Sequence, residues 1–296
     1  MMISPHGMLD PWITARGRWK KTLARLGYER RSWRDARLFH ALTDSEAADI
    51  ARETSAARHP TIAVVPNYVA TDTSLITPRS NLVLYIGRIH PKKNLEPLVD
   101  GWLAAEAAAA GYRLAIAGWG DPAHVAALQV KLAASADPSI SFLGPVYGEQ
   151  KHNLLHEARF VILPSLSEGL PMAILEAWAA ATPALMSASC NLPEGFSAGA
   201  AFDTGITADC IAVALRQALA LPEPDWQRMS AAGAIAGADP VLGPSRSQRN
   251  GSRSIAASRR RYKGEPWLFS RRAKQSRWKA GQASASAIVF IAHCGR

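Results

Sequence analysis

From Asn81 onward, short apolar runs alternate with longer segments of helical periodicity. The runs "NLVLYIG", "YRLAIAG", "ISFLG", "FVILPS" and "PALMS" each have the length and apolar character of a buried strand. The segments between them, such as "PAHVAALQVKLAAS", carry the apolar spacing of helices. This alternation is typical of a parallel sheet that helices cover on both faces. The sequence therefore predicts a doubly wound α/β domain, whose ligands bind beyond the carboxyl ends of the strands.

This predicted domain occupies residues 76–236 and has a different kind of segment on each side. Residues 1–75 contain a basic, Trp-bearing helical region, a strand that runs into a capped helix ("LFHALTDSEAADIARE") and a further strand ("TIAVVPNYV"). These elements are too few for a complete α/β domain, so we expect a partial second domain that is cut short at its beginning. Residues 237–296 form an Arg/Ser-rich tail with little periodicity.

The tail carries the excess positive charge of a chain whose formal net charge is +10. Thirteen of the 34 Lys and Arg residues follow Leu242, where Glu265 is the only acid, and the remainder is nearly neutral. Such a composition cannot bury enough apolar surface to fold alone. We therefore predict that the tail is disordered or translated in a shifted reading frame. A nucleic-acid binder would depend on this segment alone, and we expect no nucleic-acid partner.

The chain lacks the sequence marks of a membrane span, a secretion signal or a metal site. No run of about 18 apolar residues occurs, and the start, "MMISPHGMLDPW", has no charged-then-apolar layout. Cys190, Cys210 and Cys294 lie far apart without metal-type spacing, and the sequence contains no Asp-x-Asp pair. We therefore expect a cytoplasmic protein that needs no metal or cofactor.

The segment "EGLPMAILEAWAAATP" places Glu168 before a Gly-Leu-Pro turn and Glu176 inside the helix that follows. Pro171 suits the first turn of a helix, where a missing N–H costs nothing. The N–H groups and dipole of such a helix start attract an anion such as a diphosphate. The two carboxylates could accept hydrogen bonds from sugar hydroxyls. Alternatively, Glu168 only complements the helix dipole and Glu176 is an exposed surface residue.

A second candidate site, "GRIHPKKN", follows the first strand of the predicted domain. It places Arg88 directly after the strand and Lys93 at the next helical region. Arg offers a planar fork for phosphate oxygens and Lys a point charge. Either residue alone could be a solvated surface base. Because both motifs follow strands of one parallel sheet, we expect them to face the same crevice.

These motifs together resemble the retaining glycosyltransferases of family 4, also called glycosyl transferases group 1. The segment around Glu168 and Glu176 looks like their Glu-x7-Glu motif, and "YIGRIHPKKN" is similar to their phosphate segment. The runs "AIAGWGD", "ISFLGPV" and "PNYV" occur in the family's order, and the resemblance covers roughly Ser4 to Met229. It implies the GT-B architecture, in which two Rossmann-like domains face each other, here with only a partial amino-terminal one.

The resemblance also implies a role for each candidate residue. Arg88 and Lys93 would neutralise the donor diphosphate, Glu168 would bind the hydroxyls of the donor sugar, and Glu176 would bind the ribose hydroxyls. The loop "SPHGMLDPW" resembles an amino-domain loop whose histidine, here His6, reaches the donor sugar. The catalytic candidates are therefore Arg88, Lys93, Glu168 and His6. The donor-binding candidates are Gly87, Gly144, Val146, Gly169, Leu170, Pro171, Met172 and Glu176.

The implied reaction moves a sugar from a nucleotide-diphospho-sugar to a saccharide or lipid-linked acceptor, with retention of the anomeric configuration. Arg88 and Lys93 would replace a divalent metal ion, and the acceptor would attack from the front face because no enzymic nucleophile is evident. The sequence of the loop around His6, "SPHGMLDPW", favours a role in bacterial polysaccharide synthesis. The basic stretch from Arg16 to Arg37 could contact the anionic inner-membrane surface, or could be a solvated helix face.

Three departures from the family leave other functions open. The opening strand and glycine-rich loop of the amino domain are absent before Met1. The Arg/Ser tail stands where the final helices belong, and Tyr68 replaces a common glycine. The chain could instead be an inactive nucleotide-binding fragment of such an enzyme, a nucleotide-sugar epimerase, or a nucleic-acid binder that acts through its tail.

Overall fold

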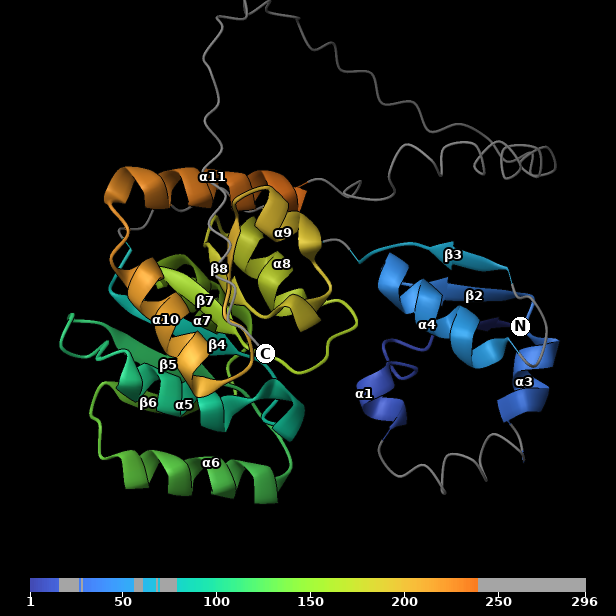
Figure 1. The fold of residues 1–296 in the computed structure, drawn as a ribbon, viewed down its shortest axis with the longest axis horizontal. Coiled ribbons are helices and arrows are strands. Elements are labelled where there is room, and N and C mark those ends of the chain that lie inside the picture. Colours follow the sequence, from blue (N-terminus) through green and yellow to red (C-terminus); the bar gives the residue numbers. More distant parts are fainter. Residues whose placement is uncertain (16–26, 28, 56–60, 68, 70–78, 239–296) are drawn as a thin grey trace, which may run out of the picture. The chain divides into compact units, whose positions relative to one another are not determined.

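The computed structural model describes residues 1–15, 27, 29–55, 61–67, 69 and 79–238, and Figure 1 shows their fold. Tyr68, most of the basic stretch and nearly all of the predicted tail lie outside the described residues. None of the helices within the described ranges is long and apolar enough to span a membrane.

The amino-terminal part contains a small parallel sheet in the order β1-β2-β3. Its strands are β1 (Met2–Ile3), β2 (Leu38–Ala41) and β3 (Ile62–Val64), and its helices are α1 (Pro11–Thr14), α3 (Arg30–Asp35) and α4 (Asp44–Thr54). Thr43 caps α4, because its hydroxyl accepts a hydrogen bond from the Glu46 N–H at 3.2 Å. The predicted strand that runs into a capped helix is therefore confirmed. A small core of Trp33, Phe39, Ala41 and Ile50 holds this part together.

The carboxyl-terminal part is built on a six-stranded, entirely parallel sheet in the order β6-β5-β4-β7-β8-β9. The strands are β4 (Leu82–Ile86), β5 (Arg113–Ala117), β6 (Ile140–Gly144), β7 (Phe160–Leu163), β8 (Ala184–Met186) and β9 (Ala201–Asp203). The chain starts at the central β4, moves outward to β6, and then crosses back to β7 on the other side of β4. This reversal creates a topological switch point between β4 and β7, where such sheets bind ligands.

Helices cover both faces of the large sheet, as the alternating sequence pattern predicts. They are α5 (Leu95–Ala104), α6 (Pro122–Ser135), α7 (Gly148–Glu157), α8 (Met172–Ala179), α9 (Pro193–Ser197), α10 (Ala208–Leu219) and α11 (Glu223–Ala238). Helix α5 packs against α6 and α10, whereas α8 packs against α7 and α11. In Figure 1, α6 and α11 accordingly lie on opposite sides of the sheet. The architecture is the predicted doubly wound α/β fold.

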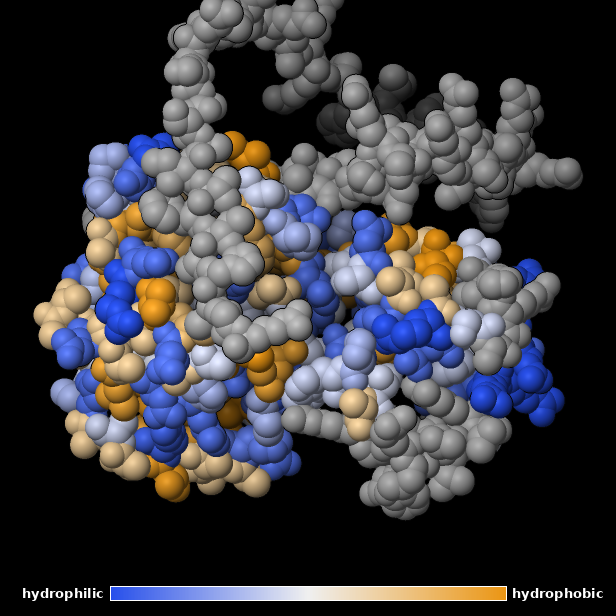
Figure 2. Space-filling view, in the orientation of Figure 1, coloured by the Kyte–Doolittle hydropathy of each residue, from blue (hydrophilic) through white to orange (hydrophobic). Residues whose placement is uncertain are grey.

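The burial of each strand follows its place in the large sheet. Every residue of β4, β7 and β8 is buried, whereas the residues of the edge strand β6 alternate between half-buried and exposed. Trp102 and Trp178 are the largest fully buried side chains of this core. Gly101 lets α5 approach α10 closely, because a Cβ there would lie 2.7 Å from Ile211. On the surface, hydrophilic and hydrophobic residues are interspersed over the visible face of the described part (Figure 2).

Two stretches differ from the prediction. No helix or strand is predicted for residues 188–203, but the structure has there a 3-10 helix, η3 (Ala188–Cys190), together with α9 and β9. These elements have three to five residues, which is too short for a periodic signal. In addition, Pro171 does not lie in the first turn of α8. It is the extended N-cap residue, with φ −78° and ψ 95°.

Candidate functional site

The turn after β4 is fixed to the end of β5 by backbone contacts that only glycine permits. The Gly87 N–H donates to the Ala117 carbonyl at 3.1 Å, and the Ile89 N–H donates to the Trp119 carbonyl at 2.7 Å. A Cβ on Gly118, whose φ is +157°, would lie 1.8 Å from the Gly87 carbonyl oxygen. The carboxyl ends of β4 and β5 therefore form one rigid unit.

Arg88 leaves this unit with its guanidinium available to a ligand. Its side chain is exposed, and its guanidinium carbon lies 5.5 Å from the ring centroid of Trp119. The Tyr85 hydroxyl donates to the Arg88 carbonyl at 2.9 Å and thereby fixes the backbone beneath. No acid in the part of the chain that the structure describes forms an ion pair with Arg88.

Lys93 and Glu168 form an ion pair across the topological switch point. Lys93 ends a 3-10 helix, η2 (Pro91–Lys93), after β4, and Glu168 lies in the loop after β7. The Lys93 ammonium donates directly to a Glu168 carboxylate oxygen, and the two side chains are only 13% and 8% exposed. The Leu166 N–H donates to the Lys92 carbonyl at 2.8 Å and joins the two loops. The structure thus brings these two predicted residues into contact.

The backbone around Glu168 is held on both sides. Its N–H donates to the Ser189 carbonyl at 3.0 Å, and its carbonyl accepts from the Asn191 side-chain amide at 2.5 Å. Burial raises the pKa of the Cys190 thiol to about 12, and the nearby Glu168 charge adds to this shift. Burial and the same charge also raise the pKa of Tyr85. Cys190 is therefore a neutral thiol at pH 7 and not a nucleophile.

The start of α8 presents free backbone donors at the same edge of the sheet. No side chain caps this helix at Pro171. Within the described residues, the N–H groups of Gly169, Leu170, Met172 and Ala173 have no hydrogen-bond acceptor. Free N–H groups and the positive end of a helix dipole together form a binding site for an anion.

Glu176 lies one turn further along α8 and is paired with Lys151 of α7. The Lys151 ammonium lies 2.7 Å from Oε1 and 2.6 Å from Oε2 of Glu176. The two side chains are 32% and 24% exposed, so solvent reaches the pair. Lys151 could not be predicted from the sequence, because a single lysine in an amphipathic helix carries no signal of its own.

The loop that begins with Gly144 joins the end of β6 to the same edge. The Gly118 N–H donates to the Gly144 carbonyl at 2.8 Å. Gly144 has a φ of +70°, and Val146 beyond it is buried. The ends of β6, β5, β4 and β7 are thus connected by hydrogen bonds from one strand end to the next.

His6 lies in the turn that follows β1 of the small sheet. It has a φ of 51°, and its ring meets the His40 ring edge-on at a centroid distance of 6.3 Å. The Glu46 carboxylate accepts from the Gly7 N–H at 2.6 Å and fixes the loop. The role of His6 toward a donor sugar stays a prediction.

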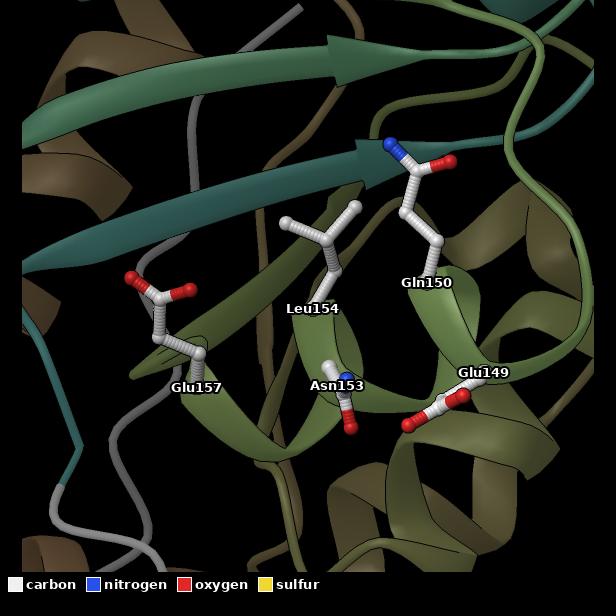
Figure 3. A pocket seen from close by; sticks show the side chains of 5 residues that line it. All are labelled: Glu149, Gln150, Asn153, Leu154 and Glu157. Carbon is white, nitrogen blue, oxygen red and sulfur yellow. The ribbon is translucent and has the colours of Figure 1, made fainter.

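A shallow pocket lies elsewhere, along α7 (Figure 3). Its lining is formed by Glu149, Gln150, Asn153, Leu154 and Glu157. None of these residues belongs to the predicted site, and Glu157 is already bound to Ser80 and Arg113. Among the described residues, no group of three His, Cys, Asp or Glu side chains is arranged to hold a metal ion.

The switch-point arrangement can be compared with known proteins. Residues 80–220 match the glycosyl transferases group 1 family model. All the candidate residues from Gly87 to Glu176 lie within this match, whereas His6 lies outside it. No curated protein matches the chain in sequence.

Solved structures of GT-B glycosyltransferases share the fold. The chain superposes on a UDP-forming α,α-trehalose-phosphate synthase from Burkholderia xenovorans with a TM-score of 0.67 and 13% identity, over 87% of this chain and 68% of that one. For sucrose-phosphate synthase from Thermosynechococcus elongatus the TM-score is 0.64 and the identity 20%, over 87% of this chain and 68% of that one. For HepE from Anabaena, in complex with UDP and glucose, the TM-score is 0.64 and the identity 15%, over 86% of this chain and 71% of that one.

The chain spans less than two thirds of other enzymes that it resembles. It covers 62% of the trehalose-phosphate synthase from Burkholderia vietnamiensis and 43% of the pneumococcal O-GlcNAc transferase GtfA. The family match and the shared fold together support a GT-B glycosyltransferase.

Proposed function

We propose that the carboxyl edge of the six-stranded sheet binds a nucleotide-diphospho-sugar, and that the chain transfers its hexosyl group with retention. The acceptor is a saccharide or a lipid-linked saccharide in bacterial polysaccharide synthesis, and the reaction takes place in the cytoplasm. The observation that carries this proposal is the buried Lys93–Glu168 ion pair at the switch point, next to the free N–H groups of α8.

The diphosphate is the part of the donor that this edge fits best. Arg88 has no acidic partner among the described side chains, and Lys93 lies on the same turn. The free N–H groups at the start of α8 add further positive potential. When the bond between the anomeric carbon and the β-phosphate oxygen breaks, negative charge builds on that oxygen. Cations and dipoles that are already in place stabilise this charge without reorganisation.

The two glutamates fit the hydroxyl-bearing parts of the donor. Glu168 is held against Lys93, so its second oxygen can accept a hydrogen bond from the donor sugar. Glu176 is oriented by Lys151 and can accept hydrogen bonds from vicinal ribose hydroxyls. The acceptor hydroxyl attacks the anomeric carbon on the face that the diphosphate leaves. Its proton passes to the departing phosphate oxygen, which accounts for retention without an enzymic nucleophile.

UDP is the nucleotide to test first. HepE and GtfA were both solved with UDP, and the trehalose-phosphate synthases are UDP-forming. Calorimetric titration of the full chain with UDP, GDP and ADP tests the proposal. We expect one of the three to bind, and Arg88→Ala and Glu176→Ala each to weaken this binding about tenfold or more.

Two control variants should keep the affinity of the wild type. Lys131→Ala removes a half-buried lysine that pairs with the exposed Asp100, and Glu223→Gln neutralises an exposed acid that pairs with Arg159. The proposal fails if no nucleotide binds, or if Arg88→Ala and Glu176→Ala bind as tightly as these controls.

A second assay separates an enzyme from an inactive fragment or an epimerase. Incubation with the matching nucleotide-sugar should release the nucleoside diphosphate. This release should be faster when a saccharide acceptor is added. An epimerase would change the sugar without this acceptor dependence. A fragment would bind the donor and leave it intact.

A further inference from the structure

Trp119 is an exposed aromatic side chain at the carboxyl edge, and neither the core nor the proposed transfer chemistry accounts for it. Its side chain is 52% exposed, whereas Trp102, Trp178 and Trp226 are each no more than 6% exposed. An exposed indole at the edge proposed to bind the donor can contact a ligand, because it offers a large apolar ring face.

The backbone of Trp119 is held in place more firmly than a surface residue requires. Its carbonyl accepts from the Ile89 N–H at 2.7 Å, and a glycine lies on each side of it. A Cβ on Gly118 or Gly120 would lie 1.8 Å or 2.2 Å from a carbonyl oxygen of the β4 turn. The indole therefore projects from a fixed base.

The position of Trp119 relative to the diphosphate groups decides what it can contact. Neighbouring strands lie about 5 Å apart. The end of β5 is therefore one strand from the end of β4, which Arg88 follows, and one strand from the end of β6, where the Gly144 loop begins. The Arg88 guanidinium lies 5.5 Å from the ring centroid of Trp119. A group joined to the diphosphate through one ribose could reach this aromatic ring.

The Lys151–Glu176 pair indicates the direction in which a bound nucleotide would extend. Glu176, the proposed ribose partner, is held by α7, and α7 begins directly after the Gly144 loop. A base attached to that ribose would lie beside this loop. Trp119 borders the loop on the β5 side, because Gly118 is hydrogen-bonded to Gly144 at 2.8 Å.

We propose that Trp119 stacks on the nucleobase of the bound nucleotide, so that Arg88 and Trp119 bind its diphosphate and its base as one unit. This inference rests on the proposed function. An indole has no base-specific hydrogen bonds to offer in the stacked arrangement, so it supplies affinity for any nucleobase.

Three binding experiments on the full chain test this inference. Trp119→Ala should weaken UDP binding about tenfold. The affinity of Trp119→Ala for inorganic pyrophosphate, measured by competition with UDP, should stay within about twofold of the wild-type affinity. Trp119→Phe should bind UDP nearly as well as the wild type, because phenylalanine can still stack. UDP should also quench part of the tryptophan fluorescence, and Trp119→Phe should lose that part.

Each other outcome overturns the inference. If the affinities for UDP and pyrophosphate fall equally in Trp119→Ala, the indole serves only to hold Arg88. If UDP binding is unchanged and only the KM for an acceptor rises, the indole contacts a sugar instead. If the wild type binds no nucleotide at all, the proposed function fails with it. Normal UDP binding by Trp119→Ala would overturn the stacking role alone.

Discussion

The two edges of the six-stranded sheet use charged residues in different ways. At the amino edge, Arg79, Arg113 and Arg159 are all bound to other parts of the protein. At the carboxyl edge, Arg88 has no acidic partner among the described residues, and the N–H groups at the start of α8 have no acceptor. Both edges are cationic. The three arginines of the amino edge already donate to carbonyls or carboxylates of the protein, whereas Arg88 pairs with no acid among the described residues.

Arg79 shows most clearly how the amino edge is used. Its guanidinium donates to the carbonyls at the ends of α7 and α8, including those of His156 at 2.5 Å and Ala180 at 2.6 Å. These carbonyls carry the negative ends of the helix dipoles. Burial lowers the pKa of Arg79 to about 10, so it remains charged at pH 7. Arg113 pairs with Glu157 and Arg159 with Glu223 in the same region.

The comparison indicates that the amino edge serves stability and the carboxyl edge serves binding. A cation whose donors are already satisfied by carbonyls or carboxylates cannot bind a phosphate without losing those bonds. Replacing a cation by alanine should therefore lower mainly donor binding and transfer at the carboxyl edge, and mainly stability at the amino edge.

The largest effect is expected for Lys93→Ala at the carboxyl edge. The rate of sugar transfer, as kcat/KM, should fall about a thousandfold, because the diphosphate loses a cation and Glu168 is left buried without its partner. A coupled assay for released nucleoside diphosphate measures this rate. Lys131→Ala, which removes a solvent-accessible ion pair with Asp100 away from the proposed site, is the matched control and should keep the rate of the wild type. Equal rates in the two variants would contradict the binding role of this edge.

The next largest effect is expected for Arg79→Ala at the amino edge. The free energy of unfolding should fall by about 2–4 kcal/mol, because the carbonyls at two helix ends lose a charged donor. Urea titration measures this change. The UDP affinity of the folded variant should stay within about threefold of the wild type. A large loss of UDP affinity without a loss of stability would remove the distinction between the two edges.

The smallest effect concerns His90, in the turn between Arg88 and Lys93. Its Nδ1 accepts from the Lys92 N–H at 3.1 Å and so must be unprotonated. Burial, the adjacent His124 and the neighbouring bases Arg88, Lys92 and Lys93 lower the pKa of His90. The unfolded chain therefore binds a proton first as the pH falls below about 6.5, and the folded state loses stability.

His90→Asn keeps an acceptor for the turn and removes the titrating group. Urea titrations at pH 7.5 and pH 5.5 should show a smaller loss of stability in this variant than in the wild type. An identical loss in both proteins would show that His90 takes no part in the pH dependence.

The sequence allowed most of the large sheet to be predicted, because its strands are buried and its helices are periodic. "FVILPS" and "PAHVAALQVKLAAS" correspond to β7 and to α6, which spans Pro122–Ser135. The short β9 and α9 could not be predicted, since three to five residues carry no period. The sequence predicts Pro171 in the first turn of α8, whereas it is the N-cap residue one position earlier. Prolines at these two positions look alike in a sequence.

The candidate site could be predicted in part. Arg88, Lys93, Glu168 and Glu176 follow strands of one sheet, and the Lys93–Glu168 contact agrees with that prediction. Lys151 and Trp119 could not be assigned, because their importance comes from contacts with residues distant in the sequence. Strand order determines these contacts, and a pattern of alternating elements does not specify strand order.

A structure of the full chain with UDP tests the central claim most directly. We expect the diphosphate to lie between the Arg88 guanidinium, the Lys93 ammonium and the N–H groups of Met172 and Ala173. Glu176 should then accept hydrogen bonds from the ribose. A diphosphate bound at the α7 pocket or at the amino edge, with the start of α8 unoccupied, would contradict the account.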